Sequence, residues 1–168
     1  MAHLARVSTL RVPGLLPAAL LAASLAGCCA IVCRAKSPPA EAAGSVVGTL
    51  QRLIDGDNAR DLETVLSCYT DDVTWLPPGE PSLHGKDAIR ERYEKLFAGF
   101  TVEFTLEIAE ATTDGSTGYA SGTTHGTLTP AGGGEPMQVN DHFLAVLRCE
   151  DGTWRVARLA WSPQQHAP

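Results

Sequence analysis

The stretch from Met137 to Ser162 constrains the fold of this chain more than any other. Two runs rich in β-branched and aromatic residues, Gln138–Arg148 and Thr153–Trp161, flank the sequence Glu150-Asp151-Gly152. An Asp-Gly pair between two such runs is a strong local signal for a β-hairpin. The sequence therefore predicts two antiparallel strands that are joined at this turn.

The length of this turn decides which side chains share a face of the hairpin. A two-residue turn at Asp151-Gly152 places His142 opposite Trp161, whereas a three-residue turn that includes Glu150 places Asp141 there. A slip of one residue moves every side chain to the other face. We prefer the three-residue turn because it collects an apolar floor with one carboxyl group on a single face: Asp141, Phe143, Ala145, Ala157, Leu159 and Trp161. The opposite face then carries His142, Leu144, Val146, Arg148, Trp154, Val156 and Arg158.

The composition is that of an ordinary globular domain with an acidic balance. The chain has 168 residues, of which 44% are hydrophobic and 19% charged, and its formal net charge is −6. This length suits one domain plus an export segment. The acidic balance and the lack of a basic stripe argue against nucleic acid as a partner. Neither a metal-ligand spacing nor a phosphate-binding loop occurs, so we expect no metal and no cofactor.

The first residues have the pattern of a targeting segment. Arg6 and Arg11 precede an uncharged run, Val12–Cys33, which contains Leu25-Ala26-Gly27-Cys28. This tetrapeptide resembles a bacterial lipobox, in which the cysteine is lipidated and becomes the new N-terminus. We therefore expect an exported, membrane-tethered lipoprotein that faces the periplasm or lies at the cell membrane. A simple secretory signal remains open, as does a single uncleaved N-terminal membrane anchor.

This interpretation divides the chain into four parts. Residues 1–27 are the signal segment, residues 28–44 the lipidated N-terminus and tether, residues 45–163 the folded domain, and residues 164–168 a tail. Export permits a disulfide bond between Cys68 and Cys149. The alternative is that both are small buried residues, and spacing does not decide between the two.

Helical patterns precede strand patterns along the domain. Val46, Leu50, Leu53 and Ile54 share one helical face, and we expect Gly56-Asp57 to break that helix. Further elements are predicted as helices over Arg60–Cys68 and Lys86–Ala98, and as strands over Val73–Leu76, Phe100–Ile108 and Gly118–Thr129. Helices followed by strands indicate an α+β fold, with the helices packed on one face of an antiparallel sheet.

The order of these motifs resembles the SnoaL-like and ketosteroid-isomerase-like branch of the nuclear-transport-factor-two-like superfamily. The resemblance covers about Val46 to Ser162. The motifs that carry it are Asp61-Leu62-Glu63, Tyr69-Thr70-Asp71-Asp72-Val73, Pro78-Gly79, His84-Gly85-Lys86-Asp87-Ala88-Ile89, Gly118-Tyr119, Asp151-Gly152-Thr153-Trp154 and Trp161-Ser162. It implies a cone-shaped curved sheet that wraps a long N-terminal helix, with two further short helices, an open apolar pocket and a homodimer through the sheet.

Within this branch, ketosteroid isomerase uses a base Asp and an oxyanion hole made of a Tyr and a protonated Asp. Asp141 matches the protonated Asp of that enzyme. The position of the base falls at Pro77, and the position of the Tyr falls near Leu50 or Leu53. Because neither group is retained, we do not expect steroid isomerisation.

Asp141 is the candidate catalytic residue, as an acid whose pKa is raised by an apolar pocket. The candidate ligand-binding residues are Tyr69, Trp75, Tyr93, Phe143, Leu159 and Trp161. For the Tyr and Trp residues among them, the alternative is ordinary core. His142 replaces Asp141 in the pocket if the two-residue turn forms. His125 could line the pocket mouth, although an exposed face suits it better, and His84 belongs to the turn before a helix.

Three functions follow from these residues. The domain could bind a small apolar molecule without transforming it. It could be a proton-transfer enzyme, an isomerase, cyclase or lyase, that uses Asp141. It could also be a dimerisation or interaction domain whose pocket is filled by side chains. An open cavity would favour the first two, and the missing base and Tyr favour the first and third over the second.

Overall fold

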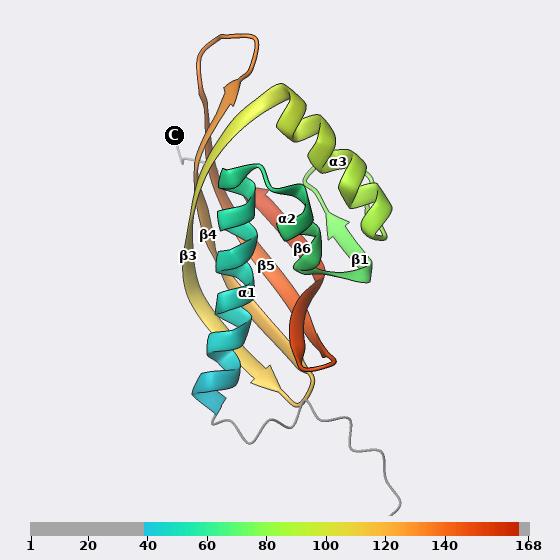
Figure 1. Cartoon of the computed structure of the whole chain (residues 1–168). Coiled ribbons are helices and arrows are strands. Elements are labelled where there is room, and N and C mark those ends of the chain that lie inside the picture. The colour runs from blue at the N-terminus through green and yellow to red at the C-terminus, as the bar shows by residue number, and fades with distance from the viewer. Residues whose placement is uncertain (1–38, 165–168) are drawn as a thin grey trace, which may run out of the picture.

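The domain is a long helix cradled by a curved sheet. The computed structural model describes residues 39–164, with side chains described from Ser45 onward. Its elements are α1 (Pro39–Ala59), α2 (Leu62–Ser67), β1 (Tyr69–Leu76), β2 (Leu83–His84), α3 (Lys86–Gly99), β3 (Phe100–Asp114), β4 (Thr117–Pro130), β5 (Met137–Glu150) and β6 (Thr153–Pro163). In Figure 1, α1 lies across the inner face of the sheet, and α3 closes one end of the cone.

The sheet has the strand order β2-β1-β6-β5-β4-β3 and is not closed. β1 runs parallel to β6, whereas all other neighbouring strands in the described residues are antiparallel. This arrangement confirms the predicted α+β class and the curved sheet around a long N-terminal helix. The expected helix over Lys86–Ala98 is also present, as α3.

Two glycines of β4 allow the sheet to curve. A Cβ atom on Gly122 would lie 1.9 Å from the carbonyl oxygen of Glu107, and one on Gly126 would lie 1.9 Å from that of Glu103. No side chain can occupy those positions without moving β3 away from β4. The bend that encloses α1 therefore depends on residues without a side chain.

The hairpin between β5 and β6 has a different register from the one we expected. Glu150 pairs with Thr153, so the turn has two residues, and Asp151 and Gly152 both have positive φ, 50° and 77°. This is the geometry of the tight turn that matches strand twist. The three-residue turn is therefore wrong.

A bulge nevertheless restores the predicted pocket face beyond the turn. The pairing shifts between Val146 and Leu147, so Phe143, and neither Asp141 nor His142, lies opposite Trp161. The extra residue returns Asp141, Phe143, Leu159 and Trp161 to one face. Between the turn and the bulge, the predicted assignment of side chains to the two faces is wrong for Trp154 and Val156, which we placed on the outer face. Both are buried in the core, next to α1.

The first helix runs through the predicted break. α1 continues past Gly56-Asp57 to Ala59, and it begins at Pro39, within the segment that we expected to be a tether. The side chain of Asn58 fixes its C-terminal end to β3. The backbone N–H of Phe104 donates to Asn58 Oδ1 at 2.6 Å, and Asn58 Nδ2 donates to the Phe104 carbonyl at 2.8 Å.

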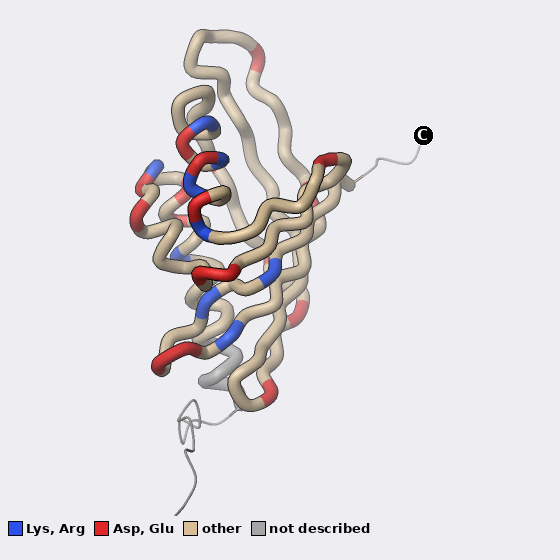
Figure 2. The backbone as a smooth tube through the Cα atoms, turned by 90° about the vertical axis from the view of Figure 1, so that its right-hand side faces the viewer, with Lys and Arg blue, Asp and Glu red and all other residues tan. Residues whose placement is uncertain are grey.

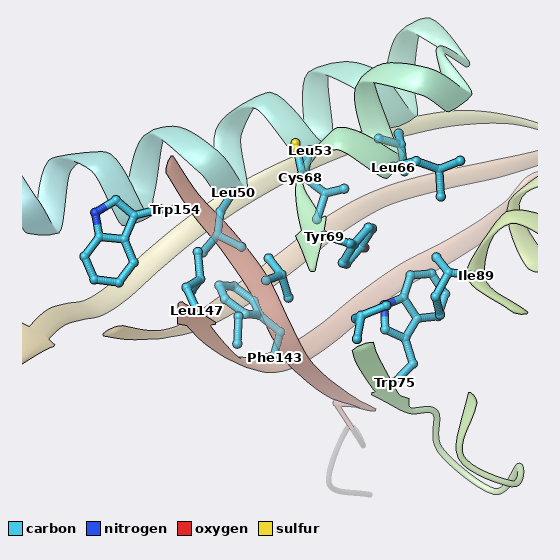
Figure 3. Close-up of a cluster of buried hydrophobic side chains, with 14 of the residues drawn as sticks. Leu50, Leu53, Leu66, Cys68, Tyr69, Trp75, Ile89, Phe143, Leu147 and Trp154 are labelled. Carbon is cyan, nitrogen blue, oxygen red and sulfur yellow. The ribbon is translucent and has the colours of Figure 1, made fainter. Parts of the chain in front are cut away.

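The core lies between α1 and the sheet. Figure 3 shows Leu50 and Leu53 of α1 facing Phe143 and Leu147 of β5, with Tyr69 further along the same layer. Cys68 is buried and its thiol is free, so Cys68 and Cys149 are not bonded to each other.

The predictions about residues 1–38 lie outside the described residues. These are the signal segment, the lipidation of Cys28 and the alternative membrane anchor. Within residues 39–164, no helix is long and apolar enough to span a membrane.

Candidate functional site

A cavity of about 260 Å³ lies between α1, α3 and the inner face of the sheet. Ligand pockets usually measure about 300–1,000 Å³, so this cavity suits a small molecule. Most of its lining is apolar. The lining residues are Leu50, Leu53, Ile54, Asp57, Tyr69, Trp75, Arg92, Tyr93, Leu96, Phe104, Leu106, Thr124, Leu128, Val139, Asp141, Phe143, Leu159 and Trp161.

The structure brings all the predicted pocket residues together around this one cavity. The candidate acid Asp141 lines it, and so do the six candidate ligand-binding residues. They come from four elements, because Tyr69 and Trp75 lie on β1, Tyr93 on α3, and the others on β5 and β6. The cavity is open rather than filled by side chains.

Asp57 of α1 is the one buried carboxyl group of the cavity. Its side chain is almost completely buried, with 5% of the residue surface exposed, and Oδ1 has no hydrogen-bond partner in the described part of the chain. Burial disfavours the charged form and raises the pKa of Asp57 from 3.8 to about 7. This carboxyl group can therefore gain or lose a proton near neutral pH.

A hydroxyl chain leads from Asp57 across to β1. The Tyr93 hydroxyl hydrogen-bonds to the Asp57 carboxyl, and this contact lowers the pKa of Asp57 part of the way back. The Tyr69 hydroxyl lies 3.3 Å from that of Tyr93. Because each phenol has one proton, Tyr69 donates to Tyr93 when Tyr93 donates to Asp57. Burial, together with the nearby Asp57, raises the pKa of both tyrosines well above 10.

Aromatic rings surround this chain. The ring centroid of Trp75 lies 5.3 Å from those of Tyr93 and Trp161 and 5.7 Å from that of Tyr69. The Trp75 indole is buried, and its side-chain hydrogen bond to Tyr69 lowers the pKa of that phenol part of the way back. The carboxyl oxygen Oδ1 of Asp57, which has no partner among the described residues, thus lies beside the aromatic part of the site.

Asp141 is half-buried, and it pairs across the sheet with Thr124, which also lines the cavity. Partial burial raises its pKa from 3.8, as the sequence predicted. The shift is smaller than that of Asp57 because Asp141 keeps more contact with water. Of the two acids, Asp57 is the more strongly perturbed.

Arg92 is the one basic residue in the described lining. Its guanidinium donates to both carboxylate oxygens of Glu80, at 2.9 and 3.0 Å. Along α3, basic and acidic positions alternate (Figure 2), so the outer surface of this helix is a mixed-charge face. The positive charge of Arg92 is therefore already paired.

The three histidines of the described residues lie away from the cavity. His125 and His142 alternate with the pocket-facing Thr124 and Asp141 and so point to the outer face. His125 Nε2 lies 3.6 Å from a Glu107 carboxylate oxygen. His84 is exposed beside Thr74. Among residues 39–164, no group of three or more His, Cys, Asp or Glu side chains is placed to hold a metal ion.

We did not predict Asp57 as a site residue, because we interpreted Gly56-Asp57 as the end of the helix. The signal was present, since position 57 follows Leu53 and Ile54 at helical spacing and therefore falls on the buried stripe. A carboxyl group on an apolar stripe is a candidate functional residue. Pro77, at the expected position of the base, follows β1 and has no ionisable side chain.

The fold and the cavity together define a cone-shaped domain of the nuclear-transport-factor-two-like superfamily. The SnoaL-like domain matches residues 50–157, so this chain belongs to the SnoaL-like domain family.

Three solved structures illustrate the similarity. A ketosteroid isomerase-like protein from Erwinia carotovora atroseptica is 26% identical, with a TM-score of 0.69 over 75% of this chain and 98% of that one. A conserved protein from Planctomyces limnophilus is 23% identical, with a TM-score of 0.70 over 74% and 99%. A nuclear-transport-factor-two-like protein with a cystatin-like fold from Novosphingobium aromaticivorans is 16% identical, with a TM-score of 0.64 over 76% and 85%. No curated protein matches the chain.

Proposed function

We propose that this domain binds a small, mostly apolar molecule in the cavity, with the polar end of the molecule at Asp57. The observation that carries the proposal is an open cavity of about 260 Å³ that contains a buried carboxyl oxygen without a partner in the described residues. A buried polar atom without a hydrogen bond costs roughly 1–3 kcal/mol. A ligand that supplies the missing partner recovers this free energy and adds apolar contact.

Two neighbouring residues of β4 provide a direct test. Thr124 lines the cavity, whereas Thr123 points to the outer face and accepts a hydrogen bond from Gln164 at 3.3 Å. Thr124→Phe should fill the cavity, and Thr123→Phe should leave it open. Native mass spectrometry of the full chain isolated from cells should show a bound small molecule for the wild type and Thr123→Phe, but not for Thr124→Phe. An empty wild-type protein that also fails to take up small aromatic probes would contradict the proposal.

A second candidate function is proton transfer, and the protonation of Asp57 favours it. A group whose pKa is about 7 is half-protonated at neutral pH and is suited to take a proton and return it. This candidate moves the catalytic role from Asp141 to Asp57. The Erwinia protein, described as ketosteroid isomerase-like, is a relative for which such chemistry is named.

Proton transfer can be tested without knowing the substrate. In D₂O, a proton-transfer site should speed the exchange of the α-hydrogens of a small cyclic ketone, which NMR detects. Asp57→Asn should abolish this acceleration, and Asp141→Asn should leave most of it. Exchange at the uncatalysed rate in the wild type would leave binding as the better account of the site.

We also propose that the domain is exported and tethered through a lipid on Cys28. The support is the tetrapeptide Leu25-Ala26-Gly27-Cys28 after an apolar run. Intact mass and membrane partitioning of the expressed protein should show a processed, lipidated chain, and Cys28→Ser should block both changes. Cys29→Ser is the matched control, because it removes the adjacent thiol and keeps the tetrapeptide. Unchanged processing of Cys28→Ser would favour a simple signal or an uncleaved anchor.

A further inference from the structure

The ionisable residues that line the cavity and have no partner of opposite charge in the described part of the chain are both acids. Asp57 and Asp141 are both acids that line it, and no described cation is bonded to either. Arg92, the basic residue of the described lining, is held by Glu80 through two hydrogen bonds. A ligand with a carboxylate or phosphate would meet two acids and a cation that is already paired. The charge pattern therefore disfavours an anionic ligand.

The surroundings of Asp57 suit a positive charge. The rings of Tyr69, Trp75, Tyr93 and Trp161 form a contiguous set, with centroid separations of 5.3–6.5 Å between neighbours, and all four line the cavity. Aromatic faces attract ammonium groups within about 6 Å, most strongly when water is excluded. A cation in this part of the cavity would lie among these rings, with the Asp57 carboxylate as its counterion.

Asp57 itself lacks such a counterion. A buried carboxylate is costly unless it is paired with a cation and hydrogen-bonded. The Tyr93 hydroxyl satisfies part of the carboxyl group, but Oδ1 has no partner among the described residues. The carboxyl group thus lacks a hydrogen-bond donor at Oδ1 and a cation beside it, and Asp57 is one of the residues that line the cavity.

We propose that the ligand of this cavity is a small organic cation, an amine or quaternary ammonium compound with an apolar body, whose nitrogen pairs with Asp57 among the rings of Trp75 and Tyr93. This inference rests on the proposed function, because it names the class of molecule that the cavity binds. The two acids, the aromatic walls and the pairing of Arg92 with Glu80 carry it together. A neutral ligand that accepts a hydrogen bond from protonated Asp57 is the competing outcome of the test.

The test compares four probes of similar size and shape against the full chain. 2-Phenylethylamine is cationic, 2-phenylethanol is neutral and polar, propylbenzene is neutral and apolar, and phenylacetate is anionic. Isothermal titration at about pH 8, where Asp57 is mostly ionised, gives the four affinities. We expect the amine to bind about tenfold more tightly than the alcohol, and phenylacetate not to bind.

Two variants assign the preference to a residue. Asp57→Asn keeps the shape and removes the charge, so the amine should lose its advantage over the alcohol. Asp55→Asn removes an exposed acid of the same helix that does not line the cavity, so it is the matched control, and the preference for the amine should persist in it. Persistence of the preference in Asp57→Asn would overturn the assignment to Asp57.

A measurement on the wild type keeps the inference testable if Asp57→Asn does not fold. At about pH 6 most Asp57 is protonated, so binding of the amine should release close to one proton, as titration in buffers of different ionisation enthalpy reveals. Release of no proton would contradict the pairing. If the alcohol or propylbenzene binds as tightly as the amine or more tightly, the inference that the ligand is an organic cation is wrong. The proposed function would still hold. If none of the four probes binds, the proposed function fails with it.

Discussion

The hydroxyl of Tyr93, on α3, hydrogen-bonds to the carboxyl of Asp57, on α1, and holds its pKa below the value that burial alone would give. Tyr93→Phe removes this donor and stays otherwise isosteric. We expect the pKa of Asp57 to rise above about 7 in this variant, because the carboxylate loses a hydrogen bond that favours it. NMR titration of the Asp57 carboxyl carbon measures the change.

Tyr69→Phe is the matched control for this prediction. Its hydroxyl contacts Tyr93 at 3.3 Å and reaches Asp57 only through that residue. The shift of the Asp57 midpoint should therefore be smaller than in Tyr93→Phe. A larger shift in Tyr69→Phe would mean that the hydroxyl chain is ordered differently.

Asp57 should make the domain less stable as the pH rises. Its pKa is about 7 in the folded state and near 3.8 in the unfolded chain, so the folded state binds its proton more tightly. The contribution of Asp57 to the free energy of unfolding is fully present below pH 3.8 and is lost as the pH rises from that value to about 7. Because an amide does not ionise, Asp57→Asn should not lose stability over this pH range. Its free energy of unfolding near pH 8 should exceed that of the wild type by up to roughly 4 kcal/mol.

Urea unfolding of both proteins across this pH range checks the prediction. Asp55→Asn, on the exposed side of the same helix, is the control and should follow the wild type. The difference between wild type and Asp57→Asn should be flat above about pH 7. A difference that does not vary between pH 4 and 7 would mean that Asp57 is not buried as described.

The curvature of the sheet should be sensitive to one methyl group. Gly122→Ala places a Cβ atom against the carbonyl oxygen of Glu107, so β3 and β4 must separate. We expect a loss of about 3 kcal/mol or more in the free energy of unfolding, measured by urea titration. Gly132→Ala is the control, since nothing lies within 4 Å of its added Cβ, and it should change stability by less than about 0.5 kcal/mol.

We propose that the outer face of the sheet forms a homodimer interface. A row of paired residues crosses four strands there, Leu76, Ala160, Leu144 and Ser121, and the two leucines are 48% and 49% exposed. Exposed leucines grouped in this way favour contact with a second copy of the sheet. Trp154 and Val156, which the sequence assigned to this face, do not contribute, so the interface is smaller than we expected.

Leu144→Arg should convert the dimer to a monomer in sedimentation velocity at micromolar concentration. Met137→Arg introduces the same charge at a similarly exposed position at the far end of β5 and should leave the dimer intact. A monomeric wild-type protein at that concentration would contradict the proposed interface.

The sequence allowed the fold class and most of the pocket to be predicted, because both depend on local patterns. The period-two alternation along the β5–β6 hairpin grouped Asp141, Phe143, Leu159 and Trp161 on one face, and the aromatic residues Tyr69, Trp75 and Tyr93 completed the predicted pocket. The bulge between Val146 and Leu147 has no comparable signal, so the sorting of Trp154 and Val156 was wrong. Asp57 was missed for a similar reason, because Gly56 normally weakens a helix and packing against the sheet overrode that tendency.

The paired hydrogen bonds between Asn58 and the backbone of Phe104 have a consequence for association between molecules. β3 is an edge strand, and the unpaired N–H and C=O groups of an edge strand can template the addition of a foreign strand. The amide of Asn58 occupies one N–H and one C=O of that edge, as a neighbouring strand would. A single side chain from the end of α1 thus prevents an incoming strand from hydrogen-bonding to the backbone of Phe104. It protects the domain against edge-to-edge aggregation at this point.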